Sequence, residues 1–497
     1  MSNQGEKTSG GGISAFDFFC IGFGAIVGVG WAVSINRWMA GSGGPIPASL
    51  GYIIALIMMV PVALCYCELA PMMPVAGGGT AYAYRAFNEK IAFISGWAAF
   101  GGFVTIIPWE AIYVCDILSI LFPFVKGPVL YTLVGSDVHL GHIVLGTVFS
   151  FLLFYINWKG ATTSAMMQRI LTVVLVGSGL VAMIVALTKF NTSNFSPIYE
   201  QVGRGVHNNF FGGALAILAS APFFLAGFET IPQAVEDAEG DITSVGKTVV
   251  LSVSLACIFY AGLLFCLGSA MPWQEFVQVR DAAGNIVNEG LANPAAANLF
   301  MHIYPNAMGT VMYYLILTGA ICGLLTTWNG FMMASPRLLM GMARGYMMPR
   351  ALAKQNEFGT PTTGLICCLV LSLIGPFLGM GLIDPLTSFS AAGFVTSWAI
   401  TSFCVVSLRK KEPNAERPYK LPGGSVTAWF AGIFMTIVWF LLFIPFGANP
   451  VFMGNMACYL FVGWMVIGVV LYMIAGSDRN KVSVEERTRS LFARKGE

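Results

Sequence analysis

Long apolar stretches separated by short polar connections run through the whole chain. Each stretch approaches or exceeds the roughly 20 residues that an α-helix needs to cross the hydrocarbon core of a bilayer. Strands of a membrane barrel would instead give alternating segments of about 10 residues. The pattern predicts an all-α integral membrane protein with 12 transmembrane helices, near residues 14–38, 46–70, 91–122, 140–158, 165–188, 209–234, 245–271, 308–341, 363–383, 385–408, 425–447 and 450–475.

The composition agrees with a protein that lies mostly within the lipid bilayer. Hydrophobic residues make up 56% of the 497 residues and charged residues only 10%, whereas soluble domains carry about 25% charged residues. The net charge of +2 gives no indication of a nucleic-acid partner. The 11 cysteines lie almost all inside apolar stretches, which predicts small buried side chains rather than disulfides. We expect no cofactor.

Lysine and arginine predict the orientation of the chain. With the N-terminus inside, 21 of the 26 lysines and arginines fall on inner segments and five on outer segments, as the positive-inside rule requires. An even number of spans then places both tails, residues 1–13 and 476–497, in the cytoplasm. Because the N-terminus lacks a cleavable signal pattern, we expect a multi-pass protein of the plasma (inner) membrane that retains its first helix.

Glycines interrupt two apolar stretches at corresponding places. The first stretch contains GFGAIVGVGW at 22–31, and the sixth contains LAGFE at 225–229. Five helices separate the two positions, so a second unit starting there would enter the membrane with the opposite topology. Interrupted segments in matching places of two halves indicate the binding site of a secondary transporter. The plain alternative is that glycine is frequent in membrane helices.

Three ionisable side chains lie within predicted spans, where each is a functional hypothesis because a charge in the membrane is costly. Glu110 follows Pro108, which kinks a helix and frees a carbonyl, so the pocket would suit a cation; a neutral or lysine-paired carboxyl is the alternative. Asp116 faces elsewhere, and we expect it to be hydrogen-bonded or solvated. Glu229 follows the second break, where it could bind free amides, carry a proton or cap the broken helix.

Four motifs resemble those of the amino acid–polyamine–organocation superfamily of permeases, in the order and spacing of that superfamily. GAIVGVG at 24–30 is similar to its GAIIGSG break, and YCELAPMMPVAGGGTAYAYRAF at 66–87 resembles the segment that follows. FFLAGFETI at 223–231 is similar to the second break. GLLTTWNGFMMASPRLLMGMARGYMMP at 323–349 resembles the eighth span and its loop.

The resemblance implies a 5+5 inverted-repeat transporter core with discontinuous helices 1 and 6. The two five-helix repeats would occupy residues 14–188 and 209–408, and residues 425–475 would form two extra C-terminal helices. The resemblance also implies alternating access for small amines or amino acids.

The resemblance further implies a set of substrate contacts. A substrate carboxylate would bind the N–H groups of Gly28, Val29 and Gly30, and its ammonium would bind the carbonyls of Ile26, Phe223 and Ala226. Half-helix N-termini and freed carbonyls favour these charges on physical grounds as well. Phe223 matches an aromatic gate, and Trp328 or Phe331 would supply a second aromatic wall unless they only pack. Gly227, Phe228 and the span 6 glutamate, Glu229, complete the second break.

The sequence departs from the superfamily pattern in three places. Val29 replaces a serine or glycine, which removes one hydroxyl contact to a carboxylate. Thr162 stands where many relatives carry a lysine, so that charge is missing here. Either a cation near Thr326 and Thr327 fills the gap, or protons act at Glu110 and Glu229, or the protein exchanges substrates without an ion. Glu110 makes the third span negative, which favours a substrate with excess positive charge.

The sequence therefore predicts a secondary active transporter of amino acids or organic amines, coupled to H⁺ or Na⁺, that acts as a monomer or homodimer. An exchanger that swaps a precursor for its decarboxylated amine is the alternative. A membrane-embedded enzyme would need a nucleophile–base pair or a metal cluster at one depth, and the four histidines fall in or beside predicted loops.

Overall fold

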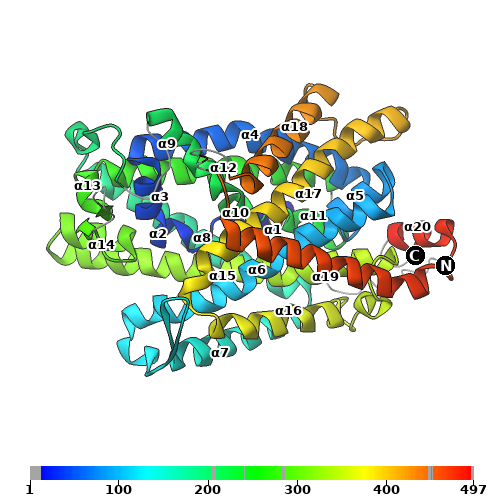
Figure 1. Ribbon diagram of the computed structural model, residues 1–497, viewed down its shortest axis with the longest axis horizontal. Coiled ribbons are helices and arrows are strands. Elements are labelled where there is room, and N and C mark those ends of the chain that lie inside the picture. The colour runs from blue at the N-terminus through cyan, green and yellow to red at the C-terminus, as the bar shows by residue number, and fades with distance from the viewer. Residues whose placement is uncertain are drawn as a thin grey trace, which may run out of the picture.

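The computed structural model describes residues 13–202, 209–239, 241–280, 286–445, 449 and 451–493. Most long helices in this part of the chain run along one common direction (Figure 1). Within it, ten helices are long and apolar enough to cross a membrane. They are the interrupted segment Ala15–Val33, α4 (Pro45–Met72), α6 (Glu89–Leu121), α7 (Leu140–Trp158), α8 (Ala161–Leu187), α12 (Ile242–Gly268), α15 (Ala307–Arg344), the segment Met380–Lys411 with α17 (Ile383–Lys411), α18 (Ser425–Phe443) and α19 (Asn455–Arg479).

Two shorter apolar segments lie where the sixth and ninth spans were predicted. Phe210–Ala219 combines α9 (Phe210–Ala216) with a 3₁₀ turn, and Thr362–Phe377 combines α16 (Thr362–Ile374) with another. These turns and the second break shorten the continuous helices. The all-α membrane architecture is thus confirmed, while the number of 12 crossings and the division into two inverted repeats stay predictions.

Local sequence explains where several of these helices begin. The side chain of Asn88 accepts the N–H of Ile91 at the start of α6, and Asn306 does the same for Met308 at the start of α15. Such side chains satisfy the first free amides of a helix. Pro385 lies in the first turn of α17, where proline is tolerated. The predicted boundary beside it therefore coincides with the start of a helix.

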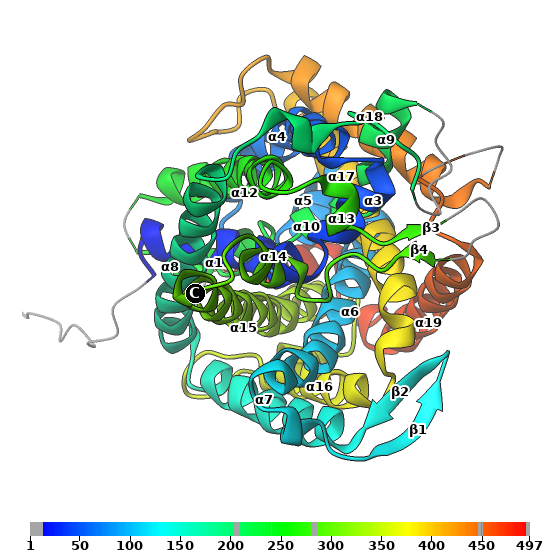
Figure 2. The same ribbon diagram turned by 90° about the vertical axis from the view of Figure 1, so that its left-hand side faces the viewer.

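The first broken helix lies in the middle of the bundle. Figure 2, which looks along the helices, shows α1 (Ala15–Ile26) surrounded by α6, α8, α12 and α15. Glycine allows this close packing: a Cβ atom on Gly24 would lie 2.3 Å from the hydroxyl oxygen of Thr172 on α8. Small residues at helix contacts are typical of packing in membranes, where backbones approach closely.

The connections gather at the two ends of the bundle (Figure 1). At one end lie α5 (Gly79–Ala86) and α20 (Val484–Phe492), and we call it the α20 end. At the other lie α13 (Trp273–Phe276), α14 (Ala295–Ile303) and two hairpins, formed by β1 (Val129–Leu133) with β2 (Ser136–His139) and by β3 (Val279–Arg280) with β4 (Ile286–Asn288). The loop between α12 and α15 thus contains two short helices, and the sequence did not predict the hairpins.

Both described ends of the chain lie at the α20 end, as an even number of crossings requires. The N–H of Ile13 donates to the carbonyl of Asp237 at 2.9 Å, and Asp237 in turn pairs with Arg337 of α15 at 3.0 Å. Arg350, which follows α15, donates to Ser490 of α20. Residues 1–12 of the predicted N-terminal tail lie outside the described residues.

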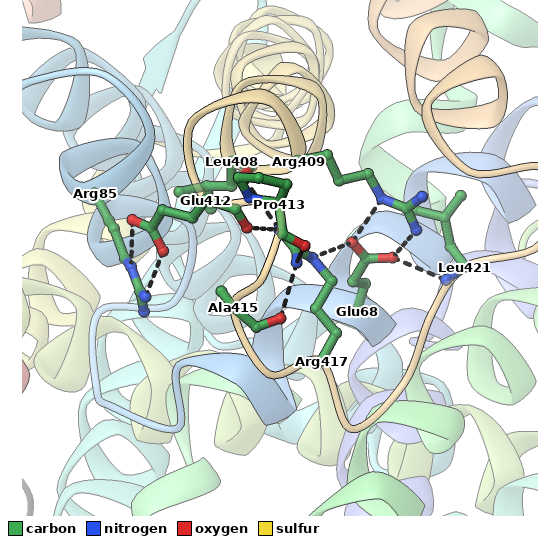
Figure 3. A network of polar contacts seen from close by, with 9 residues as sticks. All are labelled: Glu68, Arg85, Leu408, Arg409, Glu412, Pro413, Ala415, Arg417 and Leu421. Atoms are coloured by element: carbon green, nitrogen blue, oxygen red, sulfur yellow. Dashed lines mark hydrogen bonds and ion pairs between the residues drawn. The ribbon is translucent and has the colours of Figure 1, made fainter.

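Ion pairs connect the loops at the α20 end (Figure 3). Glu68 of α4 is buried, and its carboxylate accepts two bonds from Arg409 of α17, at 3.0 and 2.6 Å. The N–H of Leu421 adds a third bond at 2.8 Å, and the Arg417 guanidinium lies 3.4 Å away. Arg85 of α5 forms a second bidentate pair with Glu412. These contacts fasten α4, α5 and α17 to the loop before α18.

Candidate substrate-binding site

Both predicted helix breaks are present. The first broken helix stops at Ile26 and resumes as α2 (Gly30–Val33) and α3 (Ile35–Ser42). The second consists of α9, α10 (Ala221–Leu225) and α11 (Thr230–Gln233), with a non-helical stretch at 226–229. Each break leaves backbone N–H and C=O groups without helical partners. These groups are available to side chains or to a ligand.

The two breaks pack directly against each other. Gly227 has φ +133°, and a Cβ atom there would lie 2.6 Å from the carbonyl carbon of Ala25 and from the nitrogen of Ile26. Glycine is therefore required both by the backbone conformation and by the space. On the other side of the first break, a Cβ atom on Gly323 of α15 would lie 2.6 Å from the carbonyl oxygen of Gly28.

A cavity of about 20 Å³ lies between the breaks and α6. A space of this size holds about one or two water molecules, so side chains must move before an amino acid enters. Its walls come from the first break (Ala25, Ile26, Gly28, Val29, Gly30), from α6 (Ile106, Trp109, Glu110), from α10 (Phe223, Phe224) and from α15 (Thr327).

Glu110 is the one ionisable side chain among these lining residues. It is buried, and its Oε2 has no hydrogen-bond partner among the described residues. Its other oxygen is directed toward the first break, because a Cβ atom on Gly28 would lie 3.5 Å from Oε1. An unpaired carboxyl group in a buried cavity attracts a cation or a proton. Glu110 therefore lines the cavity between the breaks, and its binding of a cation stays a prediction.

Aromatic rings line one side of the cavity. The ring centroids of Phe223 and Trp109 are 5.5 Å apart, so the predicted gate residue faces a partner on α6. Trp328 and Phe331 do not line the cavity: both are buried, and Phe331 packs against Phe103. Consecutive helical residues point about 100° apart, and Thr327 is the residue of α15 that faces the break. The second aromatic wall comes from α6.

The remaining residues of the second break have packing roles. Ala226 and Gly227 lie outside the cavity lining, and Gly227 contacts the first break. The Phe228 ring packs against Tyr66 of α4 and Trp398 of α17, with centroids 5.3 and 5.4 Å apart. The contacts of Gly227 and Phe228 hold the break in position, and the substrate contacts expected of all three residues stay predictions.

Glu229 binds a free amide of the second break. Its Oε2 accepts the N–H of Gly227 at 2.8 Å, and its Oε1 accepts the indole N–H of Trp398. One of the roles considered for Glu229, binding a freed amide, is thus present, whereas α11 begins after Glu229 without a side-chain cap hydrogen bond. Carrying a proton is a separate role that stays a prediction.

A buried cluster of amides and hydroxyls lies beside α1 on the side of α8. Gln168 donates to the carbonyl of Thr326 and accepts from Asn329, both at 2.9 Å, and Thr172 donates to the carbonyl of Cys20 at 3.1 Å. Thr162 is exposed in the first turn of α8 and lies outside this cluster. Gln168, six residues further along α8, has its amide nitrogen beside Gly24 of the first broken helix.

The hydroxyls of Thr326 and Thr327 are both hydrogen-bonded. Thr326 donates to Gly323 within its own helix at 2.9 Å, and Thr327 donates to Gly24 at 3.3 Å. Thr327 therefore reaches across to α1, and its hydroxyl oxygen and the Gly24 carbonyl lie side by side. Two neighbouring oxygens of this kind are a partial set of ligands for a hard cation.

Sequence reasoning missed Tyr260 of α12. Its hydroxyl lies 3.0 Å from the carbonyl oxygen of Ile26 and 3.3 Å from that of Phe224. One side chain thus contacts both breaks. The only available signal was a hydroxyl-bearing residue inside an apolar span, which by itself does not predict a contact with a distant segment.

Asp116 has the hydrogen-bonded role that was predicted for it. It pairs with Lys126 and with His142, each at 3.3 Å. His139 and His142 lie at the start of α7, at the end of the bundle opposite the α20 end. Within the described part of the chain, three or more His, Cys, Asp or Glu residues nowhere gather as a group that could hold a metal ion.

Comparison with known proteins agrees with this architecture. Residues 13–470 match the sequence profile of a family described as "Amino acid permease". The branched-chain amino acid permease BcaP of Bacillus subtilis (strain 168) is 23% identical, covering 97% of this chain and 96% of its own length. The L-asparagine permease of Escherichia coli (strain K12) is 24% identical, covering 85% and 81%. The methylthioribose transporter of Bacillus subtilis (strain 168) is 22% identical, covering 93% and 92%. The chain therefore belongs to the amino acid permease family, as a membrane transporter of the amino acid–polyamine–organocation superfamily rather than an enzyme.

Proposed function

We propose that this permease moves amino acids or organic amines, preferably cationic ones, across the plasma membrane by alternating access. The cavity between the two breaks carries the proposal, because it brings backbone groups of both breaks together with the buried carboxyl of Glu110, whose Oε2 has no hydrogen-bond partner among the described residues. Free amides suit a carboxylate and free carbonyls suit an ammonium. An amino acid presents both groups on one carbon atom, and an amine presents the second alone.

Each end of a bound amino acid has a proposed place. The carboxylate lies against the amides of Gly28, Val29 and Gly30, all of which line the cavity. The ammonium lies near the carbonyls of Ile26, Phe223 and Ala226. The rings of Phe223 and Trp109 offer their faces to a cation, an interaction worth about 0.5–2 kcal/mol.

Glu110 supports a preference for substrates with excess positive charge. A second ammonium or guanidinium group would pair with the carboxylate inside the cavity, where burial strengthens the interaction. Two of the matched permeases are named for branched-chain amino acids and for asparagine, and a third relative is named for methylthioribose. These descriptions favour amino acids as a class, and the preference within that class is inferred from Glu110.

Coupling to an ion has two candidate places. Protons would act at Glu110, with Glu229 as the second candidate. Sodium would bind near Thr326 and Thr327, where the Gly24 carbonyl and the Thr327 hydroxyl supply two oxygens. The amide nitrogen of Gln168 stands beside this place as a donor, and a donor group offers no ligand to a cation. This observation favours the proton over sodium.

The orientation follows from the distribution of charge. Arg85, Arg409 and Arg417 lie at the α20 end, which we therefore propose to be cytoplasmic. The outer side then carries α13 and α14. The unit that transports is a monomer or a homodimer.

The first experiment is a thermal-shift screen of the purified protein against amino acids and amines, with and without sodium and at two pH values. Cationic amino acids or diamines should raise the melting temperature more than neutral ones, and the shift should depend on pH rather than on sodium. Counterflow of the stabilising compounds in proteoliposomes then tests transport. A protein that neither responds to any of these compounds nor exchanges them would contradict the proposal.

An exchanger that works without an ion gradient is the second candidate. Thr162 supports it, because this neutral residue stands where the resemblance to the superfamily expects a charged lysine. Counterflow without any ion gradient, together with no net uptake driven by a proton or sodium gradient, would identify the exchanger.

A further inference from the structure

Tyr260 contacts both broken helices from α12, a helix that contains neither break. Its hydroxyl lies within hydrogen-bond distance of two carbonyl oxygens, those of Ile26 and Phe224. A tyrosine hydroxyl has a single proton and donates to one acceptor at a time. The side chain therefore alternates between the two breaks or shares its proton unequally between them.

The two carbonyls differ in their other partners. The carbonyl of Ile26 also accepts the N–H of Gly28 at 3.1 Å. The carbonyl of Phe224 stands at the end of the short helix α10, and Tyr260 is its donor among the described residues. A buried carbonyl that loses its donor destabilises the closed protein. The Tyr260 hydroxyl thus satisfies backbone groups that face the substrate position.

Neighbouring rings hold Tyr260 in place. Its centroid lies 5.0 Å from that of Tyr52 on α4 and 5.2 Å from that of Trp38 on α3, and Trp38 lies 4.8 Å from Phe224. We call these four residues the aromatic cluster. All but Phe224 are buried. The cluster fixes the ring, so the hydroxyl reaches the breaks in a defined position.

We propose that Tyr260 is a positioning residue that supplies the missing hydrogen-bond donor when the carrier is empty. This inference rests on the proposed function. In the loaded carrier, the substrate ammonium is a stronger, charged donor and takes over the carbonyl of Ile26, while the hydroxyl stays with that of Phe224. In the empty carrier, the Tyr260 hydroxyl replaces the ammonium, so that the breaks can close and the carrier can return without substrate.

The inference separates two modes of transport. Net uptake requires the empty carrier to return, whereas exchange returns the carrier loaded at every step. Loss of the hydroxyl should therefore slow net uptake while exchange continues. A merely structural role would slow both modes together, because both need a folded protein.

The test compares Tyr260→Phe with Tyr52→Phe in proteoliposomes. Tyr52 is a matched control because it belongs to the same aromatic cluster, is fully buried, and its hydroxyl has no hydrogen-bond partner among the described residues. The probe is radiolabelled L-lysine or L-leucine, whichever the wild-type protein carries. Uptake into vesicles without internal substrate measures net transport, and uptake into vesicles preloaded with the unlabelled probe measures exchange.

We expect Tyr260→Phe to lower the maximal rate of net uptake by about tenfold or more, with exchange retained, and Tyr52→Phe to change neither. Retained exchange also demonstrates that the variant folds. An equal fall of net uptake and exchange, no change in either, or the same selective loss in Tyr52→Phe would overturn the inference. Absence of both modes in the wild-type protein would instead contradict the proposed function, and the inference would fall with it.

Discussion

Glu229 and Gly227 form a hydrogen bond across the second break: the carboxylate Oε2 accepts the glycine N–H at 2.8 Å. The other carboxylate oxygen accepts the indole N–H of Trp398 on α17. Both partners are donors, so both oxygens act as acceptors. The same Gly227 packs against Ala25 of the first break. The carboxylate therefore stabilises the contact on which the cavity depends.

We expect Glu229→Gln to lower the stability of the protein and to impair coupled transport more than substrate binding. A glutamine has one acceptor oxygen, so its amide nitrogen would face one of the two donors. The loss should be about 1–3 kcal/mol, the usual effect of leaving a buried donor without a partner. The melting temperature and the pH profile of uptake measure it. An unchanged melting temperature with an unchanged pH profile would contradict both roles, and Glu416→Gln, at an exposed loop position, is the control.

We expect Gly28→Leu to abolish substrate binding. A Cβ atom at this position would lie 2.5 Å from the hydroxyl oxygen of Thr327, and the longer side chain would enter a cavity of about 20 Å³. The thermal shift produced by the stabilising amino acid or amine should disappear. Gly177→Leu is the matched control, because a Cβ atom there meets nothing within 4 Å on the exposed face of α8. Wild-type affinity in Gly28→Leu would place the ligand elsewhere.

Much of the fold could be predicted because apolar length and glycine position are local signals. The predicted span 140–158 coincides with α7, and most other spans differ from their helices by a few residues. The breaks at Gly28 and Gly227 were also predictable, because glycine is the residue that tolerates the required conformation or close approach. In both cases, a short stretch of sequence contains the physical cause.

The side chains that complete the site were harder to predict because their positions depend on helix rotation and packing. Thr327 lines the cavity, whereas the next residue, Trp328, points about 100° away around the helix and does not. Gln168 rather than Thr162 lies beside Gly24 of α1, because Thr162 is at the start of α8, outside the buried cluster. Tyr260 contacts Ile26 across more than two hundred residues of sequence. The pattern of residues in one sequence does not show which distant residues will be in contact.

We expect Glu110→Gln to weaken the binding of cationic substrates selectively. Glutamine keeps the size of the side chain and removes its charge, so a lysine or diamine loses its counter-charge while a neutral amino acid keeps its backbone contacts. Competition of unlabelled lysine and leucine against a bound probe measures the difference. Asp116→Asn is the control on the same helix, because Asp116 pairs with Lys126 outside the cavity. An equal loss for cationic and neutral ligands would indicate a structural role for Glu110.

We expect Glu68→Gln to destabilise the protein far more than Glu412→Gln, although both carboxylates form bidentate pairs with arginine (Figure 3). The side chain of Glu68 is 1% exposed, whereas that of Glu412 is 34% exposed. Removing one partner of a buried ion pair leaves an uncompensated charge and costs about 3–5 kcal/mol, while an exposed pair contributes about 0–1 kcal/mol. Thermal unfolding of both variants in the same detergent measures the difference. Equal melting temperatures would show that burial of Glu68 does not determine the strength of this network, because the two substitutions remove the same charge from the same kind of pair.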